Sequence, residues 1–465
     1  MGSTTASGAI AATAATSSAW NGVPTLFTRT SRSGRVVRGP AKTRVTSSLA
    51  TTFSPGTTAS SRSATTASAS DASAFASLRS SLPGAKRSER TVERSVLVAQ
   101  FYVRHSAPVN LTGAPKSDIN TGSVKAVRFH DFGGLDVLRL EEVPDPVPAR
   151  GQVLLDITAS ALNHLDVDIR EGVSRFPVEP PFIPGVEVVG RIAELGEDVE
   201  GWQVGDRVMA LLMDTCGECE FCRTGRESLC TAAGFISFST SGGYAERLAC
   251  SARQLLRIPD GLDDEAAAAL QIAFGTAWHM LFTRGRLRIG ETVLINSVGS
   301  GIGSAAVQLA RLAGATVIGN AGTDEKLARA SELGMDHGIN HATQDVVAEV
   351  MRLTGDRGVD LVFEHVGGEL FQKGLDSLCK DGRLVICGGH AGEVVPFDII
   401  PFFRMQRQVI GSFVYNRTEV QSCLELASDG RITPLVHATF ALAEAREAMA
   451  MMERREHFGK ILLKP

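Results

Sequence analysis

Four cysteines are the residues of this chain whose type and spacing most directly indicate chemistry. Cys216, Cys219, Cys222 and Cys230 lie in the run CGECEFCRTGRESLC, with the spacing C-x₂-C-x₂-C-x₇-C. Closely spaced C-x₂-C pairs bring successive sulfurs around one point, and a fourth cysteine completes a tetrahedral set of thiolates. Four sulfur ligands leave no position open for water or substrate. The pattern therefore predicts one structural zinc ion that does no chemistry itself.

Disulfide bonding is the alternative use of the same cysteines. Two-residue loops between neighbouring cysteines would crowd the bridges, and no convincing secretory signal precedes them. Zinc is therefore the favoured interpretation. Free thiols beside a thiolate site also favour a reducing compartment. The thiols outside the cluster are Cys250, Cys379, Cys387 and Cys423.

The composition limits the partners of the protein. Its 465 residues are 43% hydrophobic, and no stretch approaches the roughly 20 apolar residues of a membrane-spanning helix. Residues 1–123 carry 14 Lys and Arg against four Asp and Glu, so the remaining residues are distinctly acidic. An acidic globular part argues against nucleic-acid binding. We expect a small-molecule substrate, with neither a nucleic acid nor a membrane as partner.

Residues 1–123 do not resemble a folded domain. Runs such as SLATTFSPGTTASSRSATTASAS lack an apolar periodicity and cannot bury enough surface to become ordered. A basic, acid-poor leader of this kind is typical of an organelle transit peptide. The favoured alternative is an over-extended gene model, because ordered-looking sequence begins at Val124 and no methionine occurs between Met1 and Met209. The first alternative predicts an organelle stroma or matrix, and the second predicts the cytoplasm.

Two kinds of periodicity follow Val124. Short β-rich runs punctuated by Gly and Pro predict a compact antiparallel, barrel-like domain, with the cysteine lobe inserted after GDRVMALL. From about residue 276, strands such as ETVLINSV alternate with helices such as GSAAVQLARLAG. This alternation predicts an α/β protein with a doubly wound parallel sheet. The tail is expected to form helices and a final strand that return to the first domain.

A Gly-rich turn between a strand and a helix predicts a dinucleotide site. ETVLINSV runs into GSGIGSAAVQLA, although Val298 stands where a literal G-x-G-x-x-G would begin. Glycines let the backbone approach a pyrophosphate, whose charge the helix N-terminus favours. The candidate cofactor-binding residues of this turn are Ser300, Gly301, Ile302 and Gly303.

The end of the next strand bears on the choice of cofactor. NAD-binding sites usually place an Asp or Glu there for the 2′-hydroxyl of the ribose. This chain has IGNAGTDEK instead, with Asn320 and Gly322 in the region where the acid is expected. No carboxylate would repel a 2′-phosphate, while Thr323 and Lys326 are placed to bond it. The sequence therefore favours NADP(H) over NAD(H).

These motifs in this order resemble the zinc-type medium-chain dehydrogenase/reductase superfamily. The matching runs include ALNHLDVDIREG, IPGVEVVGRIAELG, GGYAE, FGTAWHML and VFEHVGG, besides the cysteine lobe and the Gly-rich turn. The resemblance implies a GroES-like catalytic domain, a Rossmann cofactor domain, an active site between them and a homodimer or homotetramer. The implied boundaries are 124–268 with the zinc lobe at 213–232, then 269–415, and 416–465 for the return to the catalytic domain.

The three family positions that hold a second, catalytic zinc are substituted in this chain. By resemblance, the ligands would stand at Asn163, Val186 and Ile272, and none of these is a good zinc ligand. Asn at the first position resembles the quinone oxidoreductase branch, which normally lacks the cysteine lobe. The resemblance thus implies hydride transfer from NADPH to a quinone, enone or related carbonyl without a catalytic metal. The alternatives are an alcohol dehydrogenase with a rebuilt zinc site and a non-catalytic NADPH-binding protein.

The resemblance also assigns roles to individual residues. Asn163 is the candidate donor to a substrate carbonyl, or else a loop-capping residue. His164 is a candidate proton donor, or else a packed or cofactor-contacting side chain. Asp166 is expected to orient this loop rather than act as an acid. Thr276 matches a position that contacts nicotinamide, and His390, in CGGHAG, lies where the nicotinamide would be.

Overall fold

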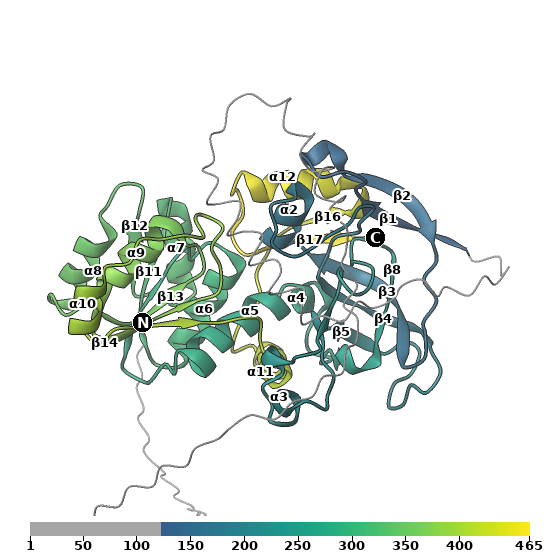
Figure 1. The fold of residues 1–465 in the computed structure, drawn as a ribbon, viewed down its shortest axis with the longest axis horizontal. Coiled ribbons are helices and arrows are strands. Elements are labelled where there is room, and N and C mark those ends of the chain that lie inside the picture. The colour runs from purple at the N-terminus through teal and green to yellow at the C-terminus, as the bar shows by residue number, and fades with distance from the viewer. Residues whose placement is uncertain (1–121) are drawn as a thin grey trace, which may run out of the picture. The chain divides into compact units, whose positions relative to one another are not determined.

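The computed structural model of the protein describes residues 122–465 (Figure 1). The first described strand, β1 (Ser123–Arg128), begins where the sequence predicts ordered structure. The transit-peptide and gene-model interpretations concern the leader, residues 1–123. All of it except residues 122 and 123 lies outside the described part of the chain.

A seven-stranded sheet forms the centre of the catalytic domain. The strand order is β16-β17-β3-β4-β5-β9, and β8 pairs with β3. Most neighbouring strands run antiparallel, but β16 and β17 run parallel. Both faces of β3 are largely buried because helices and loops cover them. The bounds are β3 Gln152–Ala161, β4 Glu187–Leu195, β5 Arg207–Ala210, β8 Arg247–Ser251, β9 Leu255–Arg257, β16 Val436–Ala441 and β17 Lys460–Lys464.

A short helix at the end of β3 carries the candidate catalytic residues. Helix α2 (His164–Glu171) begins with a reciprocal cap, in which the Asp166 carboxylate accepts a hydrogen bond from the backbone N–H of Asn163. It ends at Gly172, whose left-handed conformation suits glycine. Other elements of this domain are β2 (Arg139–Pro144), β6 (Met213–Asp214), β7 (Gly234–Phe235) and α12 (Ala445–Glu453).

The cofactor domain is a six-stranded parallel sheet with the order β12-β11-β10-β13-β14-β15. The order reverses between β10 and β13, and in such sheets ligands bind at the carboxyl ends of the strands at this point. The strands are β10 Thr292–Ile295, β11 Thr316–Ala321, β12 His337–Asn340, β13 Val359–Glu364, β14 Leu378–Ile386 and β15 Gln408–Gly411. The helices are α6 Gly301–Leu312, α7 Asp324–Glu332, α8 Val346–Thr354, α9 Gly368–Ser377 and α10 Ile399–Arg404.

The alternation of strands and helices predicted from the sequence is present, with four additional elements. Helices α9 and α10 and strands β15 and β16 were not predicted. Strand β15 is short and α10 contains a proline, so neither has a strong periodic pattern. Among the described residues, no helix is both long and apolar enough to cross a membrane.

Two segments connect the domains. Helix α5 (Gln271–Trp278) packs against α6 and continues as a π-helix, η4 (His279–Arg284), and α11 (Arg417–Ser428) packs on α5. Strand β17 then returns to pair with β3, so the yellow C-terminal strands lie beside the blue strands that open the described part of the chain in Figure 1.

The N-terminal end of α2 and the start of β4 are held together by tight packing at Gly185. Its backbone φ is +103°, and a Cβ there would lie 2.4 Å from the ring of Tyr244. The N–H of Gly185 donates to the Asp166 carboxylate at 3.1 Å, and the Tyr244 hydroxyl donates to the same group at 3.0 Å. No other residue type fits this position without displacing Tyr244.

This packing predicts a large difference between two glycine substitutions. Gly201 also has a positive φ, +77°, but a Cβ there meets nothing within 4 Å. We expect Gly201→Ala to cost about 1–2 kcal/mol from backbone strain alone. Gly185→Ala adds an overpacking cost of about 1–3 kcal/mol. Thermal unfolding of both variants measures the difference, and equal melting temperatures would contradict the packing described for Gly185.

Candidate functional site

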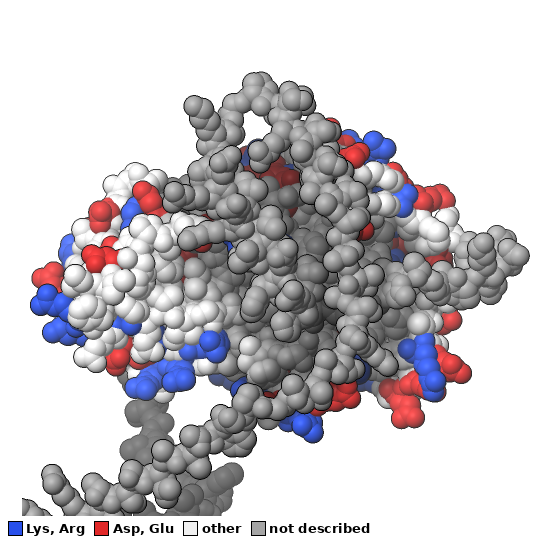
Figure 2. Space-filling model, in the orientation of Figure 1, with Lys and Arg blue, Asp and Glu red and all other residues white. Residues whose placement is uncertain are grey.

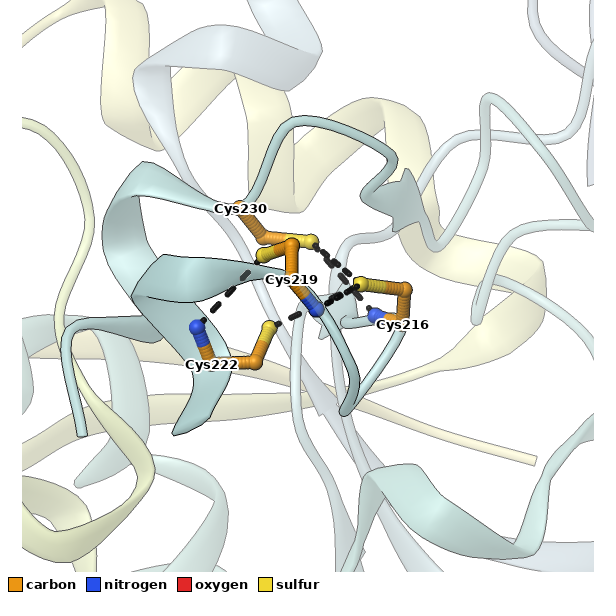
Figure 3. A group of neighbouring side chains, drawn as sticks. All are labelled: Cys216, Cys219, Cys222 and Cys230. Atoms are coloured by element: carbon orange, nitrogen blue, oxygen red, sulfur yellow. Dashed lines mark hydrogen bonds between the residues drawn. The ribbon is translucent and has the colours of Figure 1, made fainter. Parts of the chain in front are cut away.

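The four cysteines meet in a lobe between β6 and β7. Their sulfurs all lie within 4.8 Å of one another, with 3.9 Å between Cys216 and Cys222 and 3.6 Å between Cys230 and Cys216 (Figure 3). A tetrahedral zinc with Zn–S bonds of about 2.3 Å places its sulfurs roughly 3.8 Å apart. The donor set and spacing therefore fit one zinc ion.

The electrostatics of the lobe also suit a cation. A hydrogen bond from the N–H of Cys222 lowers the pKa of the Cys219 thiol to about 6, whereas burial raises the pKa of the Cys222 thiol to about 12. Four adjacent thiolates repel one another, and a divalent ion offsets this repulsion as it displaces the protons. All four positions of such an ion are filled, so it has no site for substrate.

Buried hydrogen bonds attach this lobe to the helix between the domains. The N–H of Ser228, in the lobe, donates to the Asn416 carboxamide at 3.0 Å. The N–H of Asn416 donates to the Glu419 carboxylate at 2.6 Å, and this carboxylate bonds the ring of His279 at 3.0 Å. Since His279 continues helix α5, the lobe holds one end of the helix that carries Ile272 and Thr276.

The position that would hold a catalytic zinc contains a closed hydrogen-bond network. The buried Lys460 ammonium donates to the Asn163 carboxamide at 2.8 Å and lies 2.9 Å from the Glu187 carboxylate. It also donates to the Leu162 carbonyl at 2.6 Å. The Glu187 carboxylate accepts further hydrogen bonds from the N–H of Ile272 at 2.7 Å and from the Asn163 amide at 3.3 Å.

This network does not fit a metal site. Every oxygen of Glu187 has an internal donor, Lys460 supplies a buried positive charge, and the neighbouring Ile272 offers no ligand atom. The two N–H groups of the Asn163 amide donate to Glu187 and to the Ala161 carbonyl. Asn163 is therefore bound within the protein, and it reaches a substrate only if it releases one of these acceptors.

Asp166 positions the loop rather than facing the cleft. It is completely buried, and burial raises its pKa to about 6. Its carboxylate accepts hydrogen bonds from Asn163, Gly185 and Tyr244. Both oxygens of the carboxylate are thus occupied by donors of the protein, which is consistent with the orienting role expected for Asp166.

Two histidines face each other across the domains. The ring of His164 stacks on that of His390 with 4.9 Å between centroids and 25° between planes. Burial and the neighbouring His390, His457, His365 and Lys460 lower the pKa of His164 to about 3. His164 is therefore neutral at pH 7, where its ring can donate a hydrogen bond but is a poor source of a proton.

The Gly-rich turn has the geometry expected for a pyrophosphate site. Ser300 caps α6, and its hydroxyl accepts the N–H of Gly303 at 2.9 Å. A Cβ at Gly303 would lie 2.2 Å from the Ser297 carbonyl, so only glycine fits this turn. The N–H of Gly459 donates to the Gly299 carbonyl at 3.0 Å, which brings the tail next to the turn.

Two of the predicted ribose-binding residues, Asn320 and Thr323, have roles within the protein. Asn320 is fully buried and bonds Asn296, His341 and the N–H of Ser297, so it supports the turn and does not face a ligand. Thr323 caps α7 through the N–H of Lys326.

Lys326 is the basic residue at this edge of the sheet, and the tail adds a second one. Its ammonium donates to the Arg455 carbonyl at 2.7 Å, and burial followed by the Arg455 charge lowers its pKa. Gly322 lies beside His341, with a Cβ position 3.3 Å from its ring. Sequence reasoning missed Arg455 and Lys460, because their place beside the turn depends on the return of the tail to β3.

Thr276 and a set of aromatic rings complete the site. Thr276 is buried on α5, and its hydroxyl makes no hydrogen bond with another described residue. The ring centroids of Phe235 and Phe413 are 6.2 Å apart, and Phe413 follows β15. The ring centroids of Phe238 and Phe176 are 5.2 Å apart. Two cavities, one along residues 283–291 and one beside Arg150 and Arg253, do not include these groups in their lining. On the face drawn in Figure 2, much of the surface that is not grey is white, and blue and red side chains lie mainly toward its margins.

Comparison with known proteins agrees with this arrangement. Residues 149–260 match the alcohol dehydrogenase GroES-like domain family, and residues 301–429 match the zinc-binding dehydrogenase family. The chain is 31% identical to acryloyl-coenzyme A reductase of Sulfurisphaera tokodaii, over 70% of this chain and 96% of the relative. It is 34% identical to an alcohol dehydrogenase of Geobacillus stearothermophilus, over 73% of this chain and 99% of the relative.

A solved structure gives the same result. The crystal structure of AibC is 35% identical and aligns with a TM-score of 0.70, over 76% of this chain and 99% of that chain. The α/β fold with a GroES-like domain and a Rossmann domain, predicted from the sequence, is thereby confirmed. The chain belongs to the zinc-type medium-chain dehydrogenase/reductase superfamily.

Proposed function

We propose that the protein is an NADP(H)-dependent reductase of quinones, enones or related conjugated carbonyl compounds, and that it acts without a catalytic metal. The observation that carries this proposal is the closed network of Lys460, Glu187 and Asn163. Oxidation of a simple alcohol in this superfamily needs a Lewis acid that stabilises an alkoxide. A conjugated acceptor needs only donors to the developing enolate oxygen, and so suits this site better.

The residues supply positioning and hydrogen bonds. The reduced nicotinamide supplies the hydride when it is bound. The free hydroxyl of Thr276 and the neutral rings of His164 and His390 are the donors available for a substrate oxygen. Because His164 is uncharged at pH 7, the proton that completes the reduction comes from solvent or through water, and the ring only orients the oxygen.

The names of the relatives support both a reductase and a dehydrogenase. Acryloyl-coenzyme A carries an alkene conjugated to a thioester carbonyl, which is the kind of acceptor proposed here. The alcohol dehydrogenase relative keeps open the second candidate, a zinc enzyme with a rebuilt ligand set. The number of zinc ions per chain separates the two candidates.

The cofactor preference is a further part of the proposal. Asn320 near the end of β11 and Gly322 just after it are not carboxylates, and Lys326 and Arg455 place two cations beside this edge. Burial, followed by the charge of Arg455, lowers the pKa of Lys326, and a 2′-phosphate would offset the repulsion between the two cations.

We also propose that the protein forms a homodimer through the outer edge of β15. This strand ends the six-stranded sheet, and its outer edge pairs with no other described strand. Apolar side chains of α10 nearby are more than half exposed: Ile399, Ile400 and Phe403. An open edge with exposed apolar residues favours pairing with a second copy.

The metal-free chemistry predicts the effect of two lysine substitutions on one strand. Lys460→Met leaves Glu187 charged and buried and releases Asn163, so we expect kcat/KM for reduction of an enone by NADPH to fall at least about tenfold, or about 1.4 kcal/mol. Lys464→Met is the matched control on β17, because Lys464 pairs with Glu265 at a half-exposed position. Its kcat/KM should stay within about twofold.

The same preparations test the metal count. Elemental analysis should give one zinc ion per chain in the wild type and in both lysine variants. Two zinc ions in the wild type, or alcohol oxidation that depends on the second, would contradict the proposal. NADPH binding without oxidation by any quinone or enone would instead favour a non-catalytic binding protein.

The cofactor preference predicts that Lys326→Ala weakens NADPH more than NADH. Loss of one phosphate contact should raise the Kd of NADPH about tenfold and leave that of NADH within about twofold. Arg352→Ala, on the exposed face of α8, is the control. Fluorescence titration measures both constants, and an equal loss for both nucleotides would show that Lys326 does not bind the 2′-phosphate.

The oligomer is tested at the same edge. Light scattering should show a dimer for the wild type and a monomer for Val409→Lys combined with Phe403→Glu, since charges on an edge oppose pairing. A wild-type monomer, or a dimer that survives both charges, would rule out this interface.

A further inference from the structure

A polar cavity of about 560 Å³ lies at the amino-terminal half of the cofactor sheet, away from the cofactor edge. One wall is the segment 283–291, which contains the end of η4 and the connection from it to β10. The other wall comes from the starts of β13 and β14 and from the outer strand β15. The carboxyl ends of the same strands form the cofactor edge, so the cavity is separate from the dinucleotide site.

Cations outnumber acids in this cavity by two to one. The acids that line it are Glu291, Asp360 and Asp381. The cations are on both walls: Arg284, Arg286, Arg288, Arg357, Lys380 and Arg383. The excess of positive charge lies between two opposing walls, where an anion could contact both.

Two ion pairs form the floor of the cavity: Arg383 with Glu291, and Arg357 with Asp360. The largely buried Arg383 donates to the Glu291 carboxylate at 2.6 Å and to the carbonyls of Arg286 and Asp360 at 3.1 Å. Arg357 pairs with Asp360. These contacts satisfy the two acids of the floor, so the cations of the 283–291 wall have no carboxylate partner among the described residues.

The wall itself is held in an unfavourable conformation. Arg286 has a φ of +53°, in the left-handed region that favours glycine. The preceding residue, Gly285, packs against Leu361. A side chain at Gly285 would not fit, since a Cβ there would lie 2.6 Å from the Leu361 side chain. Residues with strained backbone conformations are concentrated at active sites and ligand sites.

We propose that this cavity binds a small anion with two or more phosphate groups. The arginines of the 283–291 wall suit phosphate oxygens, because each guanidinium presents several donors in one plane, and Lys380 adds a cation from the other wall. No aromatic ring lines the cavity, so recognition depends on the phosphate charge and not on a nucleobase. Thr283 and Arg284 belong to η4, which continues from α5, so a bound anion contacts the helix that carries Thr276.

Calorimetric titration of the NADPH-saturated protein with inorganic pyrophosphate tests the proposal, because saturation blocks the cofactor's own phosphate site. At about 0.15 M salt we expect one binding event per chain. Arg286→Ala combined with Arg288→Ala should weaken it at least about tenfold. Both side chains are exposed, so the double variant is expected to fold, and unchanged NADPH affinity confirms this.

The matched control is a second cavity of about 630 Å³ in the catalytic domain. In this second cavity the acids outnumber the cations. It contains two arginines, Arg150 and Arg253, and three acids, Asp198, Glu200 and Asp214. Replacement of both arginines by Ala should leave pyrophosphate binding within about twofold. An equal loss in both double variants, or no binding at millimolar pyrophosphate, would overturn the assignment. ADP binding about tenfold tighter than pyrophosphate would also overturn it, because the base would then contribute.

Discussion

The buried ion pair between Lys460 and Glu187 determines much of what the site can do. Both side chains are almost fully excluded from solvent, and removal of one would leave an unpaired buried charge. Such a pair persists only where further hydrogen bonds satisfy both groups, and here Leu162, Asn163 and Ile272 supply them. The lysine thus provides one fixed positive charge where a metal site would need three ligands. The nearby ring of His164 carries no charge at pH 7, because burial lowers its pKa to about 3.

The position of Lys460 depends in turn on the path of the tail. The N–H of Gly459 bonds Gly299 in the Gly-rich turn, and β17 begins one residue later and pairs with β3 at Leu462 and Leu463. A short segment therefore joins the dinucleotide turn, the catalytic sheet and the acid of the substituted zinc site. Arg455, earlier in the same segment, reaches the ribose edge. A small displacement of this segment would change cofactor binding and the substituted zinc site together.

Local sequence patterns predicted the features that depend on neighbouring residues. The cysteine spacing, the strand and helix alternation and the Gly-rich turn are of this kind, because short-range geometry fixes each of them. The residues Asn163, Val186 and Ile272 led to the prediction that no catalytic zinc is bound, and this stays a prediction. The sequence could not show that Lys460 fills the gap, since it lies almost 300 residues from Asn163. Nor could it show that Asn320 is buried, because that depends on Asn296 and His341.

The four-cysteine lobe and the network of Lys460, Glu187 and Asn163 are connected through one helix. The lobe holds Asn416 and Glu419, which hold His279 at the end of α5. Near the start of the same helix, Gln271 bonds Tyr415 and the carbonyl of Ala210 in β5, next to the backbone of Ile272 that bonds Glu187. The lobe therefore fixes the helix against which the Lys460–Glu187 pair is assembled. An enzyme that acts without a catalytic zinc, as proposed, still needs that helix in place, which gives a physical reason for the four cysteines.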